Sequence, residues 1–72
     1  MLNELIKLYE KCHYEKQSLI IEITHNKICD WGIYIKHGDS ETIIYSGNGA
    51  LAEQVCRAYL ALKEWAIEED LY

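Results

Sequence analysis

Three histidines recur at an even spacing, His13, His25 and His37. Cys12 directly precedes the first, and Cys29 lies between the second and the third. A metal site needs ligands that converge from one helical turn, one strand or a tight loop, and this spacing fits neither a helical nor a strand pair. His25 and His37 also fall in expected turns, where a histidine side chain is normally solvated. We therefore expect neither a metal site nor a bound cofactor.

The other reactive side chains lack the surroundings that catalysis requires. A catalytic thiol needs a nearby histidine and a lowered pKa, whereas Cys12 and Cys56 fall on helix faces that we expect to be buried. Cys29, beside Asp30, is not assigned to a buried helix face. The glycines of 47–49 lack the lysine and the longer spacing of a phosphate loop. The paired carboxylates fall in a turn and at a helix end, without apolar surroundings to shift their pKa. We expect a protein that is not an enzyme.

Composition and charge narrow the class of partner. The 72 residues form one domain (1–72), and half of them are hydrophobic, which argues for a folded chain. Twelve acidic against 7 basic residues give a net charge of −5 at pH 7, and the lysines are scattered. Such a chain is repelled by nucleic-acid backbones and acidic membranes. We expect a protein partner with a basic surface, and no direct binding to nucleic acid or membrane.

The cysteine pattern and the N-terminal residues predict a cytosolic protein. The three cysteines are widely spaced and include no Cys-x-x-Cys pair, as expected of free thiols in a reducing compartment. The sequence Met1-Leu-Asn-Glu-Leu-Ile-Lys7 is amphipathic and acidic, without the basic flank and apolar run of a signal peptide.

The order of hydrophobic patterns predicts an α+β fold. Residues 2–14 and 50–72 have helical periodicity, and residues 18–24, 30–36 and 41–46 have the alternation of strands. Residues 25–27 and 37–40 supply turn chemistry. Gly47 and Gly49 should end the third strand and leave Asn48 to cap the last helix. The expected architecture has two layers, helix–three-stranded antiparallel meander–helix (αβββα), with both helices on one face of the sheet.

The alternation assigns each strand residue to a face. The covered face is expected to carry Leu19, Ile21, Ile23, Trp31, Ile33, Ile35, Ile43 and Tyr45. The opposite face should show Ile20, Glu22, Tyr34, Thr42 and Ile44. The predicted core contains Leu5, Tyr9, Ile21, Ile33, Ile43, Val55, Tyr59 and Leu62.

Two regions carry more apolar surface than this fold buries. Leu60 and Ile67, with Cys56, lie off the main apolar stripe of the last helix, and three of the five residues on the opposite sheet face are apolar or aromatic. Surplus apolar surface on an acidic chain suggests an interface, because charge steers encounter and aromatic residues anchor it.

The segment order resembles that of the double-stranded-RNA-binding domain. That family binds phosphates with a lysine cluster at the start of its last helix, where this chain has Gly49-Ala-Leu-Ala-Glu-Gln54, so the resemblance is in layout. The runs Leu19-Ile-Ile-Glu-Ile23, Trp31-Gly-Ile-Tyr-Ile35 and Thr42-Ile-Ile-Tyr-Ser-Gly-Asn-Gly49 also resemble small acidic proteins encoded by phages and prophages, of the anti-CRISPR type. That resemblance implies a cytosolic inhibitor that occupies a basic surface of a host nuclease.

The expected function is therefore protein binding, as an inhibitor or adaptor of a phage or mobile element. The candidate partner-binding residues are Glu22, Asp30, Tyr34, Asp39, Glu41, Ile44, Trp65, Glu68, Glu69, Asp70 and Tyr72. The alternative is a small structural module whose surplus apolar surface closes a symmetric homodimer.

Overall fold

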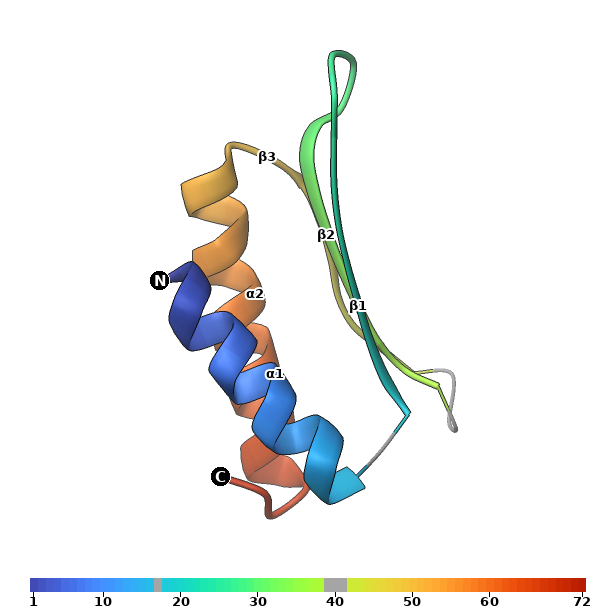
Figure 1. Ribbon diagram of the computed structural model, residues 1–72, viewed down its shortest axis with the longest axis vertical. Helices are drawn as coiled ribbons and strands as arrows, with labels where there is room; N and C mark the ends of the chain where they lie inside the picture. Colours follow the sequence, from blue (N-terminus) through green and yellow to red (C-terminus); the bar gives the residue numbers. More distant parts are fainter. Residues whose placement is uncertain (17, 39–41) are drawn as a thin grey trace.

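The computed structural model describes residues 1–16, 18–38 and 42–72 and has the expected αβββα order. Its elements are α1 (Leu2–Lys16), β1 (Leu19–Asn26), β2 (Asp30–His37), β3 (Thr42–Gly49) and α2 (Leu51–Glu68). The strands form one antiparallel sheet in the order β1-β2-β3, and both helices lie on the same side of it (Figure 1). The predicted α+β, two-layer fold is confirmed.

The core lies between the helices and β2. It contains Leu5, Leu8, Cys12, Leu19, Ile33, Ile35, Val55, Ala58, Leu62 and Ala66. Helix α2 packs on β2 and β3, whereas α1 packs mainly on α2 and reaches the sheet only at β1. There the Tyr9 hydroxyl donates a hydrogen bond to the Leu19 carbonyl oxygen, at 2.9 Å. Of the predicted core residues, Leu5, Ile33, Val55 and Leu62 are buried, and Tyr9, Ile21 and Tyr59 pack half-buried against them.

A β-bulge in β3 makes one part of the face assignment wrong. Ile35 pairs with Tyr45, but the next residue, Lys36, pairs with Ile43, so Ile44 is an extra residue in the ladder. The alternation is therefore shifted by one position on the N-terminal side of the bulge. Ile43, predicted in the core, is 58% exposed, and Ile44, predicted on the opposite face, packs against the core. Thr42, predicted on the opposite face, is also on the helix side of the sheet, because it pairs with His37, whose ring faces Trp65 of α2.

The junction between β3 and α2 depends on a buried glutamine instead of the predicted Asn48 cap. Strand β3 continues through Gly49, and Ala50 occupies the N-cap position with no side-chain hydrogen bond. Gln54 is only 2% exposed; its Oε1 accepts a hydrogen bond from the Tyr45 hydroxyl, and its Nε2 donates to the Asn48 carbonyl oxygen. A Cβ at position 47 would lie 2.5 Å from both side-chain oxygens, so this arrangement requires Gly47.

The β1–β2 hairpin is longer than predicted and projects beyond the helices (Figure 1). Its turn spans residues 27–29 because β1 continues through Asn26. The Asn26 Oδ1 accepts hydrogen bonds from the backbone N–H groups of Ile28 and Cys29, at 2.9 and 2.6 Å. Asp30 follows with a positive φ of 60°, which aspartate tolerates better than most residues. These contacts fix the turn.

Candidate functional site

The face of the sheet turned away from the helices is the candidate site, and we refer to it as the open face. The strand register arranges its side chains in three rows that cross β1, β2 and β3 in that order. The rows are Ile20–Lys36–Ile43, Glu22–Tyr34–Ser46 and Thr24–Gly32–Asn48. One end of the open face is therefore apolar, and the other is polar and carries a glycine at its centre.

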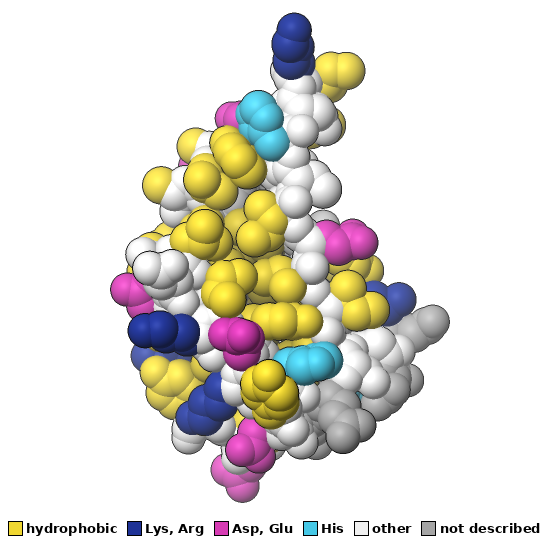
Figure 2. Space-filling model, viewed as in Figure 1, with side chains coloured by type: hydrophobic (Ala, Val, Ile, Leu, Met, Phe, Trp, Pro, Cys, Tyr) yellow, Lys and Arg dark blue, Asp and Glu magenta, His cyan; other side chains and the backbone are white. Residues whose placement is uncertain are grey.

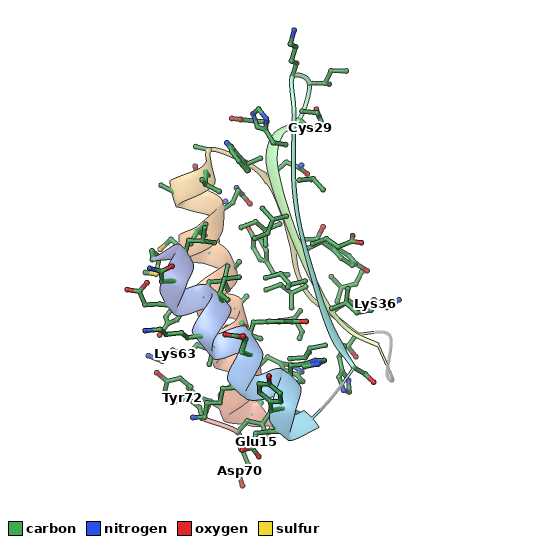
Figure 3. All side chains as sticks on the ribbon, in the orientation of Figure 1. Glu15, Cys29, Lys36, Lys63, Asp70 and Tyr72 are labelled. Atoms are coloured by element: carbon green, nitrogen blue, oxygen red, sulfur yellow. The ribbon has the colours of Figure 1, made fainter. Side chains whose placement is uncertain are left out.

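The apolar end is formed by two isoleucines on either side of a lysine. Ile20 is 44% exposed and Ile43 is 58% exposed, and Lys36, between them, points away from the helices (Figure 3). The lysine stem can lie along the isoleucines while the ammonium stays in water. Tyr34, half-buried in the adjoining row, extends this apolar surface towards the middle of the face. Such a surface has the mixed apolar and charged character of a protein interface.

The polar end contains a shallow hollow of about 260 Å³. Its lining includes Glu22, Thr24, Tyr34, Ser46 and Asn48, and Gly32 leaves it open. A Cβ at position 32 would come within 2.7 Å of the Asn48 Nδ2 and 3.0 Å of the Thr24 Oγ1. The hollow is smaller than the roughly 300–1,000 Å³ of most small-molecule sites. It is suited to a single side chain of another molecule.

Of the predicted binding residues that the structure describes, two come together in the open face. Glu22 and Tyr34 are directly paired across β1 and β2, with Glu22 exposed and Tyr34 half-buried. Asp30 lies at the projecting hairpin, where its Oδ1 is 3.7 Å from the His25 Nε2. Ile44 was predicted to bind a partner as an exposed residue of this face, but it packs against the core. The predicted residues Asp39 and Glu41 lie outside the described residues.

The remaining predicted residues lie near the end of α2. Trp65 is half-buried, 5.6 Å from the His37 ring, and Glu68, Glu69 and Asp70 are exposed. This end lies far from the projecting hairpin with Asp30 (Figure 1), and Figure 2 shows acidic side chains at separate places on the visible face. The described acidic residues therefore do not form one continuous patch.

Tyr72 has contacts within the chain that the sequence did not indicate. Its ring lies between two ammonium groups, 5.3 Å from the Lys11 Nζ and 5.1 Å from the Lys63 Nζ. A hydrogen bond with Tyr72 also raises the pKa of Tyr59. The tyrosine thus links α1 to α2, although more than half of it remains exposed.

Sequence reasoning missed the residues that complete the open face. Ile20 and Glu22 were assigned to this face by alternation, but Ile43 was assigned to the core because a bulge leaves no signal in the hydrophobic pattern. Ser46 ended the predicted strand 41–46 but was assigned to neither face, and Asn48 was missed because the glycines beside it suggested a turn. The period of two, continued from Tyr45 to Gly49, would have placed both on the same face as Tyr34.

The outer side of α2 carries the apolar surplus that the sequence predicted. Leu60 and Ile67 are 55% and 56% exposed. Cys56 is exposed as well, so its predicted burial is wrong, because the helix turns this side away from both α1 and the sheet. Cys12 is buried as predicted, and burial raises the pKa of its thiol.

Among residues 1–16, 18–38 and 42–72, no three His, Cys, Asp or Glu side chains are grouped so that they could hold a metal ion. No helix in the described part of the chain has the length and apolar character needed to cross a membrane. The chain matches no protein-family model, no curated protein and no solved structure.

Proposed function

We propose that the chain is a non-enzymatic protein-binding module whose open face docks on a basic surface of another protein. The observation that carries this proposal is the exposure of Ile20 and Ile43, beside Tyr34, on a sheet face that neither helix covers. Apolar and aromatic side chains gathered on one exposed face are typical of interfaces. The net charge of −5 favours a partner of opposite sign.

The lining of the hollow at the polar end indicates which kind of side chain the partner would insert there. Glu22 supplies a carboxylate at its wall, and Ser46, Thr24 and Asn48 add hydroxyl and amide groups. A lysine or arginine side chain has the size and the donors to enter, with its charged end at the carboxylate. The partner would then place a basic residue in the hollow and an apolar segment over Ile20 and Ile43.

The resemblance to anti-CRISPR proteins adds a class of partner to this chemistry. A nuclease that binds nucleic acid presents a basic surface, and an acidic protein seated there would block access to it. In this proposal the chain acts as an inhibitor or adaptor of a phage or mobile element in the host cytosol. Its free thiols, Cys12, Cys29 and Cys56, are compatible with a reducing compartment.

A matched pair of variants tests the role of the open face. Partners are captured from a bacterial lysate with the wild-type chain, identified, purified and titrated by calorimetry. Ile43→Glu places a charge on the open face, and Leu60→Glu places the same charge on the outer side of α2 at nearly equal exposure. We expect Ile43→Glu to weaken binding at least about tenfold, the effect of losing an interface anchor, and Leu60→Glu to leave it unchanged. A partner that binds Ile43→Glu as well as wild type would contradict the proposal.

A further inference from the structure

Strand β1 is an edge strand, and the hydrogen-bond pattern shows which of its backbone groups point outward. The Gly38 N–H donates to the Ser18 carbonyl oxygen at 2.7 Å, directly beyond the last pair of the β1–β2 ladder. Hydrogen-bonded and non-hydrogen-bonded pairs alternate in an antiparallel ladder. Ile20, Glu22 and Thr24 therefore bond to β2, whereas Ile21 and Ile23 turn their N–H and C=O groups outward. The bond from the Tyr9 hydroxyl to the Leu19 carbonyl oxygen agrees with this alternation.

The residues with outward backbone groups also carry incompletely covered side chains. Ile21 and Ile23 face the helix side of the sheet, like their partners Ile35 and Ile33. Helix α2 packs on β2 and β3, and α1 reaches only a small part of β1. Ile23 is thus 37% exposed and Ile21 is half-buried. Figure 2 shows hydrophobic side chains exposed in a band between α1 and β1.

The two edges of the sheet differ in how well they are protected against pairing with a further strand. At the far edge, β3 contains the bulge at Ile44 and two glycines, Gly47 and Gly49, and both features discourage further pairing. Strand β1 is eight residues long, pairs with β2 without a register shift, and contains no proline, glycine or lysine. Soluble proteins normally block an edge of this kind or pair it.

We propose that β1 pairs antiparallel with β1 of a second copy of this chain, with the two-fold axis at Ile23, to form a six-stranded sheet. The second copy is the occupant because it brings the same outward backbone groups and the same uncovered isoleucines. One symmetric contact then satisfies both edges. The pairing would also join the two open faces into one continuous surface.

Charge and strand length select the position of the axis. An axis at Glu22 would set two carboxylates directly opposite each other, which destabilises a strand pair. An axis at Ile21 would pair only residues 19–23, because β1 begins at Leu19. An axis at Ile23 pairs residues 20–26. It places Glu22 opposite Thr24 of the second copy and Ile21 opposite His25 of the second copy.

The oligomeric state tests the proposal. Sedimentation equilibrium or light scattering of the wild-type chain should give twice its mass of 8.4 kDa. Ile23→Lys puts a charge on the helix side of the edge and should give a monomer. Thr24→Lys makes the same addition one residue away, on the open face, and should remain a dimer. Circular dichroism shows whether each variant is folded, and we expect both to be, because both positions are exposed.

Cross-linking tests the position of the axis. In a Cys29→Ser/Cys56→Ser background, Ile23→Cys would lie opposite its own copy at a Cα–Cα distance of about 5.5 Å, which a disulfide can span. Mild oxidation should link it efficiently. Glu22→Cys would face Thr24 of the second copy and should not link.

Three results would overturn the proposal. The first is a wild-type chain that stays monomeric at the highest soluble concentration. The second is a dimer that survives Ile23→Lys but is lost in Ile43→Lys, and the third is efficient cross-linking through Glu22→Cys but not through Ile23→Cys. A monomer would leave the open-face proposal intact, because that proposal concerns the other side of the sheet. Conversely, loss of partner binding in Ile43→Glu would leave the dimer unchanged.

Discussion

Gln54 shows how one buried polar side chain can hold two elements together. It accepts a hydrogen bond from the Tyr45 hydroxyl and donates one to the Asn48 carbonyl oxygen, so it joins α2 to β3 at two points. Replacing Gln54 by leucine keeps an apolar body of similar size but removes both bonds. The Tyr45 hydroxyl and the Asn48 carbonyl are then left without these partners, and a buried group left unpaired costs about 1–3 kcal/mol.

We therefore expect Gln54→Leu to lower the free energy of unfolding by about 2 kcal/mol, measured by urea denaturation. The double variant Gln54→Leu/Tyr45→Phe serves as the control, because it also removes the stranded hydroxyl and should recover part of the loss. Equal stability of Gln54→Leu and wild type would show that solvent replaces both bonds at no cost.

The three cysteines should differ sharply in reactivity. Cys12 is buried and burial raises the pKa of its thiol above the ordinary value of 9.0, whereas Cys29 and Cys56 are exposed. A thiol reagent should modify Cys29 and Cys56 in the folded protein and reach Cys12 only after unfolding, as mass spectrometry of the labelled peptides would show. Labelling of Cys12 as fast as Cys56 would contradict the packing of α1.

The same shift gives Cys12 a pH dependence of defined sign. Because its pKa is higher in the folded than in the unfolded chain, its contribution to stability is complete below the ordinary thiol pKa of 9.0. The contribution is lost as the pH rises through the folded-state pKa. Cys12→Ala should therefore flatten the fall in stability at alkaline pH, measured by urea denaturation across that range.

At the scale of elements, the bulge in β3 decides which isoleucine stabilises the fold. Ile44 packs against the core and Ile43 is largely exposed, the reverse of what uninterrupted alternation predicts. We expect Ile44→Ala to lower the free energy of unfolding by about 2 kcal/mol, the lower end for truncating a packed isoleucine. Ile43→Ala should change it by less than about 0.5 kcal/mol, as exposed substitutions do. The opposite ranking in chemical denaturation would mean that β3 pairs without the bulge.

Local pattern was sufficient to predict the elements and their antiparallel pairing, but not the register of β3 against β2. The alternation through Ile33, Tyr34 and Ile35 placed these three residues of β2 on their correct faces, and the periodicity of α2 placed Val55 and Leu62 in the core. The bulge could not be predicted, because an extra residue becomes visible only when β3 is aligned with β2. The open face was therefore found only in part: Glu22 and Tyr34 were identified, but Ile43 was not.

The extent of β3 escaped prediction for a related reason. Gly47 and Gly49 normally suggest the end of a strand, but here Gly47 makes room for the Gln54 side chain, and β3 continues to Gly49. A glycine required by close packing has the same sequence signal as a glycine required by a turn. Only the contact with α2 distinguishes the two.

At the scale of the whole molecule, the net charge of −5 acts in opposite directions on the two proposed associations. It attracts a basic partner towards the open face but makes two copies of the chain repel each other. Salt screens both effects, since the Debye length falls from about 10 Å at 0.1 M to about 3 Å at 1 M ionic strength. The salt response can therefore identify which association is being observed.

We expect the association rate with a basic partner to fall steeply as sodium chloride rises, measured by stopped-flow mixing, while the dimer measured by sedimentation becomes tighter. Neutralising Glu68, Glu69 and Asp70 together should slow the encounter more than it speeds dissociation, because these exposed charges at the end of α2 lie away from the open-face anchors. The same triple variant should strengthen the dimer at low salt by reducing repulsion. A partner whose association rate ignores both salt and the triple variant would rule out electrostatic steering. Its binding would then depend on the short-range contacts of the open face.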